Sequence, residues 1–156
     1  MRIFVVASQE SSPLGLPRGP TRHVYDVAAV SSKIVTTLLS RAVLPSNTGV
    51  VQLSNCAFWG KFDRAALIAG EGSVSLSQCN FQHWDFGKRG LPAIEAVGGD
   101  VIVQGCQFLV PLKQIVLGEG LKTAIVQGNR FRQIEVIENK CKGDAQIGMN
   151  VVRKGD

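Results

Sequence analysis

Four segments of the chain repeat one alternation of apolar and polar positions. Each reads apolar, variable, apolar, two variable positions, Cys or Asn, a variable position and Phe. The segments are 51–58, 74–81, 101–108 and 124–131. Short alternating runs rich in β-branched residues predict strands. A period of 23 to 27 residues predicts a stacked array, in which each repeat buries its apolar side against its neighbours.

A second apolar run follows each of these segments and ends in a turn, which is rich in glycine in the first three repeats. These runs are 66–69, 93–97, 115–117 and 134–137, and a last partial repeat occupies 145–152. Glycine favours turns because it adopts backbone conformations closed to other residues. Each repeat is therefore predicted to contain two short strands separated by turns.

Two repeat architectures have a period near this value. A leucine-rich repeat requires an apolar residue three places before each segment and a helical second half. Those places hold Thr48, Glu71, Gly98 and Leu121, so only one of the four is apolar. The second halves also resemble strands rather than helices. We therefore expect an all-β chain, a right-handed, single-stranded parallel β-helix of four to five coils, with like residues stacked at about 4.8 Å.

Three of the four cysteines lie on the repeat ladder. Cys56, Cys79 and Cys106 are expected to point inward as small apolar groups, with disulfides between coils not required. Asn129 takes the cysteine position in the next repeat, where its amide can bond the backbone and tolerate a left-handed conformation. Cys141 lies off the ladder. No C-x-x-C or nearby His pair is present, so we expect no zinc site.

Residues 1–48 differ from the rest. Prolines and glycines between 13 and 20 predict an irregular arm. Apolar residues at 27, 30, 34 and 38 fit one helix face, which could cap an open end of the β-helix. The β-branched content of 34–39 favours an irregular coil instead. The expected division is thus an arm, partial coil or cap over 1–48 and β-helix coils over 49–156.

Composition narrows the class of protein. The 156 residues suit one domain, and 45% hydrophobic against 19% charged residues argues against disorder. No stretch of about 18 apolar residues occurs, so no membrane partner is expected. No clear signal peptide is present, which leaves the localisation open. The net charge of +5 allows attraction to anionic polymers, but the bases do not cluster with aromatics as in nucleic-acid modules.

Several segments resemble coils of the pectate-lyase-like superfamily. These are 55–60, 92–95, 103–108 and 124–131, and the resemblance covers residues 49–152. It implies the fold of pectate lyases, polygalacturonase-type glycoside hydrolases and phage tailspike depolymerases, which act on polysaccharides and are often secreted. Such proteins are usually longer, so the chain resembles a C-terminal portion of one. Their Asn-Thr-Asp, Asp-Asp, Gly-His-Gly and Arg-x-Pro-x-x-Arg signatures are absent, so no catalytic residue carries over.

Candidate chemistry lies in two loops, 59–64 and 82–92, which are expected on neighbouring coils. Asp63 and Asp85 are candidates for a catalytic acid/base pair, since glycosidases use two carboxylates about 5–10 Å apart. The candidate substrate-binding residues are Trp59, Trp84, His83, Lys61, Arg64, Lys88 and Arg89. Tryptophans can stack on sugar rings, bases can hold uronate carboxylates, and histidine can transfer protons. The alternative is structural: tryptophans that cover the coil wall and solvated ion pairs.

Acidic residues in the glycine turns are a second candidate. Glu71, Asp100 and Glu119 could bind calcium if the coils stacked them in register. Their offsets from the following strand differ, which favours ordinary turns. We therefore expect no metal and no cofactor.

Three functions remain open at this point. The first expectation is a non-catalytic or incomplete β-helix module of a carbohydrate-active protein, which binds a polysaccharide, possibly an anionic one. The second is a polysaccharide hydrolase or lyase that uses loop carboxylates. The third is a structural module for self-association, because open strand edges at the ends of the coils favour a homo-oligomer.

Overall fold

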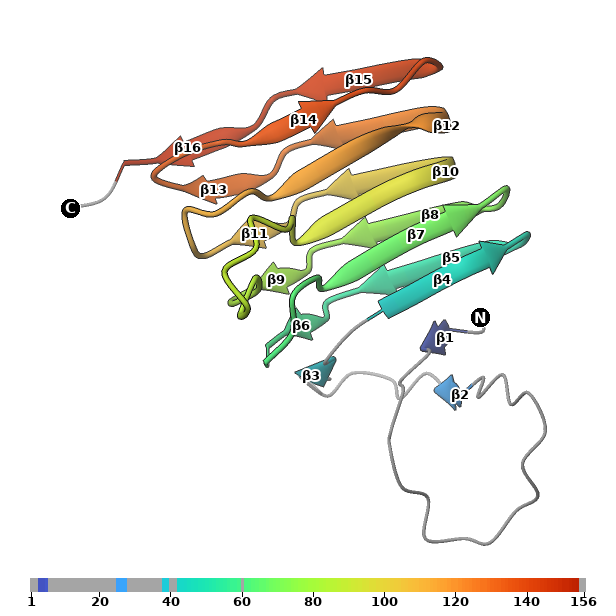
Figure 1. Cartoon of the computed structure of the whole chain (residues 1–156), viewed down its shortest axis with the longest axis horizontal. Helices are drawn as coiled ribbons and strands as arrows, with labels where there is room; N and C mark the ends of the chain where they lie inside the picture. Colours follow the sequence, from blue (N-terminus) through green and yellow to red (C-terminus); the bar gives the residue numbers. More distant parts are fainter. Residues whose placement is uncertain (1–2, 6–24, 28–37, 40–41, 60, 155–156) are drawn as a thin grey trace, which may run out of the picture.

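The structure is a computed structural model that describes residues 3–5, 25–27, 38–39, 42–59 and 61–154. In these residues the chain forms strands and no helix, and the strands wind into a parallel β-helix of about four turns (Figure 1). The predicted all-β parallel β-helix is confirmed. The alternatives predicted for 27–39, a helix face or a coil, fall largely on 28–37 and lie outside the described residues, as does most of the proline-rich arm.

The strands form three sheets. An antiparallel pair contains β1 (Ile3–Val5) and β2 (Tyr25–Val27). The eight-stranded sheet contains β4 (Ala42–Asn47), β5 (Val50–Ser54), β7 (Ala66–Gly70), β8 (Ser73–Ser77), β10 (Ile94–Gln104), β12 (Ile115–Gln127), β14 (Ile137–Asn139) and β15 (Asp144–Gly148). The six-stranded sheet contains β3 (Leu38–Leu39), β6 (Ala57–Phe58), β9 (Asn80–Phe81), β11 (Gln107–Phe108), β13 (Arg130–Arg132) and β16 (Val151–Arg153).

The register of the parallel strands matches the repeats. Phe58 pairs with Phe81, Phe81 with Phe108 and Phe108 with Phe131. A coil already lies before residue 49, in the region for which an arm, a partial coil or a cap was predicted. β3 already pairs with β6, and β4 pairs with β7. This coil is less regular in sequence than the later ones, because β3 and β4 do not carry the Cys-x-Phe motif.

β10 and β12 are long because each crosses a corner of the coil at its glycine turn. The β10–β12 register shifts twice, around Gly98 and Gly99. Gly99 has a φ of 75°, and a Cβ there would collide with the carbonyl oxygen of Gly72 on the preceding coil. The glycines after each apolar run thus let neighbouring coils stack closely at this corner.

The interior is built of ladders of like residues. The rings of Phe58, Phe81, Phe108 and Phe131 stack face to face, with centroid separations of 4.7, 4.7 and 5.0 Å. The predicted inward cysteines are buried beside them, and all four cysteines of the chain are free thiols. Such ladders combine the burial of large apolar surfaces with favourable ring contacts.

A ladder of left-handed turn residues precedes the cysteine positions. Residues 55, 78, 105, 128 and 149 have φ between 53° and 64°. The left-handed conformation therefore belongs to Gly128 and not to Asn129, which corrects one part of the prediction for Asn129. The other part is confirmed. The Asn129 side chain accepts from the Cys106 amide at 2.9 Å and donates to the Val103 carbonyl at 3.0 Å.

Candidate functional site

The outer face of the six-stranded sheet carries one column of side chains along the axis of the coils. Each residue directly after the Phe ladder lies on this face, because side chains alternate along a strand. From the coil of β6 to the coil of β16, the column reads Trp59, Gln82, Leu109, Arg132 and Arg153. The face is therefore aromatic at one end and cationic at the other.

A hollow of about 330 Å³ lies at the cationic end of this face. Its lining includes Arg130 and Arg132 of β13, Arg153 of β16 and Lys154 beyond it, over the buried rings of Phe108 and Phe131. Among the described residues, no carboxylate lines the hollow. Arg132 and Arg153 are direct register partners on adjacent parallel strands. Like charges at such positions repel, so the arrangement favours the approach of an anion.

Arg130 and Arg132 differ from several bases elsewhere on the surface. Arg64, Arg89, Lys113, Lys140 and Lys142 all form ion pairs with acidic side chains. Within the described residues, neither Arg130 nor Arg132 forms one. The Arg132 guanidinium donates to the Leu109 carbonyl at 3.4 Å, which directs it along the face.

The loops after β6 and β9 hold an exposed aromatic group. Trp59 is 58% exposed and Phe86 is 51% exposed. The Lys61 ammonium lies 5.5 Å from the centre of the Phe86 ring, and the His83 ring meets Phe86 edge-on at 6.1 Å. Aromatic faces next to a base are suited to hold sugar rings with anionic groups.

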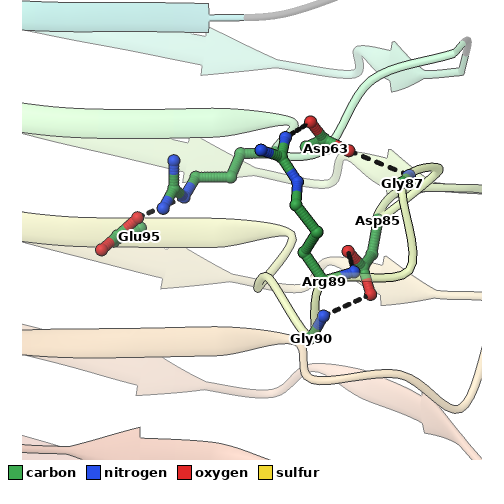
Figure 2. Close-up of polar contacts among 7 residues, drawn as sticks. Asp63, Asp85, Gly87, Arg89, Gly90 and Glu95 are labelled. Carbon is green, nitrogen blue, oxygen red and sulfur yellow. Dashed lines mark hydrogen bonds and ion pairs between the residues drawn. The ribbon is translucent and has the colours of Figure 1, made fainter.

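Arg89 lies between the two predicted catalytic carboxylates (Figure 2). Its guanidinium pairs with Asp63, and its backbone amide donates to Asp85 Oδ1 at 2.8 Å. Asp63 also accepts from the Gly87 amide at 3.0 Å, and Asp85 from the Gly90 amide at 2.9 Å. Asp85 is buried and has a φ of 51°. The structure thus brings the two carboxylates into one cluster, where both hold the 85–90 loop in shape.

Trp84 is fully buried, although the sequence suggested that it stacks on sugars. Its Nε1 donates to the Lys113 carbonyl at 2.9 Å, and its ring packs edge-on against Phe108. It therefore belongs to the core, and the sugar-stacking role does not fit its position. Phe86, two residues later, is exposed instead and was not predicted. Nothing in the spacing of the two aromatics distinguishes the inward from the outward ring.

The other predicted binding residues divide into two groups. Arg64 pairs with Glu95 on β10, and Arg89 pairs with Asp63, so the charges of both are already balanced within the protein. Trp59, His83, Lys61 and Lys88 are exposed, and their binding roles stay predictions.

The sequence analysis did not identify the four bases that line the hollow. The available signal was Arg-Phe-Arg at 130–132, where an inward Phe requires both arginines to face outward.

The acidic turn residues do not gather into a metal site. Asp100 accepts from the Thr123 hydroxyl at 2.7 Å, and Glu119 pairs with Lys142. Across the part of the chain that the structure describes, no group of three or more His, Cys, Asp or Glu side chains is arranged to bind a metal ion. In that same part, no helix is present that could cross a membrane.

Ladder thiols and one surface carboxylate have shifted pKa values. A hydrogen bond with the Cys79 thiol, together with burial, raises the pKa of Cys56. A hydrogen bond with Cys106 and burial raise the pKa of Cys79 to about 12. Protonated thiols are poor nucleophiles and poor metal ligands, so these two serve packing. Hydrogen bonds from Lys140 and Lys113 lower the pKa of Glu138 on β14.

No family model, no curated protein sequence and no solved structure matches this chain.

Proposed function

We propose that this chain is a non-catalytic β-helix module that binds an anionic polysaccharide along the outer face of its six-stranded sheet. The observation that carries the proposal is the hollow, which four bases and no carboxylate of the described residues line. We include in the proposal a relationship to the pectate-lyase-like superfamily, on the strength of the coil motifs and the parallel β-helix.

The spacing of the bases favours a polymer over a single anion. Arg132 and Arg153 lie on neighbouring strands, which are about 4.8 Å apart. Arg130 and Arg132 lie two residues apart on one strand, a separation of about 6.6 Å. A chain that carries a carboxylate or sulfate on successive sugars can engage several bases at once. Each further contact then forms at high effective concentration, which raises the affinity.

The aromatic end of the face supplies the second element of sugar recognition. Trp59 occupies the same column as Arg132 and Arg153 and is 58% exposed. Its ring can stack on the apolar face of a sugar while the bases hold the acidic groups. A polysaccharide parallel to the axis of the coils would contact both ends.

The loop carboxylates favour binding over catalysis. A retaining or inverting glycosidase needs one carboxyl group as a proton donor and the other as a nucleophile or base. Asp63 is engaged by Arg89 and the Gly87 amide, and Asp85 by two backbone amides. These bonds engage both carboxylates within the protein, which favours a structural role for them in the loop.

The test is calorimetric titration with polygalacturonate, alginate and chondroitin sulfate, with dextran as the neutral control. We expect binding of at least one acidic polymer, weakened by salt and lost in Arg132→Glu. Lys122→Glu makes the same charge change on an exposed base outside the hollow and is expected to retain binding. Equal loss in both variants, or no binding to any acidic polymer, would contradict the proposal. Release of reducing ends or unsaturated uronates that Asp63→Asn abolishes would favour the hydrolase or lyase instead.

A further inference from the structure

The loop between β9 and β10 holds an exposed aromatic ring between two residues with unusual backbone conformations. Asp85 has a φ of 51° and Lys88 has a φ of 53°, and Phe86 between them is 51% exposed. The left-handed region costs a residue with a side chain about 1–2 kcal/mol. Such conformations persist only where the surrounding structure holds them, and they concentrate at binding sites. The loop is therefore a candidate binding element on grounds that are independent of the hollow.

Contacts on two sides hold this loop in one shape. The backbone amides of Asp85 and Phe86 donate to carbonyl groups of the preceding coil at 3.1 and 3.2 Å. Trp84 anchors the loop from inside, because its ring is fully buried in the core. Arg89 ties the loop to Asp63 (Figure 2). A ligand that met the Phe86 ring would thus find it already positioned, and binding would not have to order the loop.

The charges around the Phe86 ring favour an anionic ligand. The Lys61 ammonium lies 5.5 Å from the centre of the ring, and the His83 ring meets it edge-on. Lys88 is exposed two residues further along the loop. Within the described residues, neither Lys61 nor Lys88 forms an ion pair. The two carboxylates of the loops are engaged by Arg89 and by backbone amides, so the bases rather than the acids are free to meet a ligand.

We propose that Phe86 and Lys61 form a second subsite, which binds one acidic sugar of the polysaccharide. The Phe86 ring would stack on the apolar face of the sugar, and the Lys61 ammonium would hold its acidic group. The choice of an acidic polysaccharide as the ligand rests on the proposed function. The subsite also continues the face that contains the hollow, because the loop begins directly after Gln82, in the same outward column as Arg132.

The experiment titrates wild type and variants with polygalacturonate, alginate and chondroitin sulfate by calorimetry. Phe86→Leu keeps an apolar side chain but removes the ring, and it is expected to weaken binding by up to about tenfold. Phe86→Tyr keeps the ring and is expected to bind as the wild type does. Val97→Ala is the control for the loss of an exposed apolar group, since Val97 is 40% exposed on the eight-stranded sheet. Lys61→Gln should weaken binding, whereas Lys122→Gln, at an exposed base on β12, should not.

The results for the hollow and for the loop can be told apart. If Phe86→Leu binds as tightly as the wild type while Arg132→Glu loses binding, the second subsite is overturned and the proposed function stands. If only Phe86→Leu weakens binding, the subsite is supported and the role of the hollow is contradicted. If no acidic polymer binds to the wild type, or if Phe86→Leu and Phe86→Tyr lose equal affinity, the subsite is overturned. Far-UV circular dichroism checks that each variant keeps its strand content.

Discussion

The middle coils and the last coil share one backbone register but differ in solvent exposure. Phe131 is fully buried, whereas Val152, its partner on β16, is 37% exposed. In a solenoid each coil contacts only its neighbours, so a side chain is buried only if a coil lies on each side of it. The comparison shows that the same inward position stabilises the fold in the middle of the stack and forms a surface at its end.

The column of inward turn positions changes from cysteine to asparagine between the middle coils and the last coil. In the earlier coils the thiols make weak bonds, such as Cys106 Sγ to the Leu76 carbonyl at 3.4 Å. The next two positions hold Asn129 and Asn150, whose amides bond each other and the backbone at 2.9–3.5 Å. Amides satisfy more backbone groups than thiols, which suits the coils that approach solvent.

The largest difference between the two regions is expected at the Phe ladder. Phe108→Ala removes a ring stacked on both sides and should lower the free energy of unfolding by about 3–5 kcal/mol. Val152→Ala removes a side chain with a neighbour on one side only and should cost about 1 kcal/mol or less. Urea unfolding followed by circular dichroism measures both. Equal losses would show that the last coil is covered as fully as the middle ones.

The asparagine positions should show the same contrast at a smaller scale. Asn129→Ala leaves the buried Cys106 amide and Val103 carbonyl without their side-chain partner, which should cost about 1–3 kcal/mol. Asn150→Ala affects groups nearer to solvent, where water can replace the amide, and should cost less. Chemical denaturation of the two variants gives the comparison. A larger loss for Asn150→Ala would indicate a covered end.

The thiol ladder predicts a loss of stability in alkali that belongs to the middle coils. The pKa of Cys79 rises from 9.0 to about 12 on folding. Below pH 9.0 both states keep the proton and the full contribution is present. Between pH 9.0 and about 12 the unfolded chain loses its proton first, so stability falls. Cys79 contributes at most about 1.4 kcal/mol per pH unit to the slope of this loss, and Cys56, whose pKa is also raised, adds to it.

Urea midpoints measured across this pH interval test the effect. Cys79→Val should flatten the slope of stability against pH. Val74→Ala, which shortens a buried side chain of the same coil without removing a thiol, should lower stability and leave the slope as it is in the wild type. If the slope of stability against pH is the same in all three proteins, the buried thiols do not cause the loss of stability in alkali.

The smallest effects are expected at the left-handed turn positions. Gln78 has a φ of 54°, and Gln78→Gly should stabilise the fold by about 0.5–1 kcal/mol by relieving this strain. Gly105→Ala is the reverse change one coil later and should cost about 1 kcal/mol. A Cβ at Gly105 lies 3.7 Å from the nearest side-chain atom, so only the backbone conformation opposes it. In thermal unfolding, the melting temperature of Gln78→Gly should lie above that of the wild type and the melting temperature of Gly105→Ala below it.

Met149→Gly repeats the first of these changes in the last coil, where φ is 53°. The end of a stack opens locally before the middle. Met149→Gly should therefore change the free energy of global unfolding less than Gln78→Gly does. An equal gain would mean that the last coil unfolds together with the others.

The fold could be predicted from the sequence because its signals are local and repeated. The apolar alternation sets which side chains face inward, and the Phe spacing sets the register of the coils. Both follow from the two-residue periodicity of a strand, so they hold wherever the pattern recurs. The sequence left the first coil open between an arm, a partial coil and a cap, because β3 and β4 lack the motif of the later repeats.

The candidate site could be predicted only in part. The sequence identified the two loops and correctly placed Trp59 at the surface, but it did not distinguish the buried Trp84 from the exposed Phe86.

The tertiary structure decided that Trp84 enters the core, because its indole meets Phe108 and the Lys113 carbonyl on the next coil. It also decided that Arg89 engages Asp63, a residue of the preceding coil. These contacts join residues 24 to 29 positions apart, and a loop has no periodicity that fixes where its side chains point. Inward and outward positions on strands therefore came from the sequence alone, whereas the partners of each loop side chain came only from the stacking of the coils.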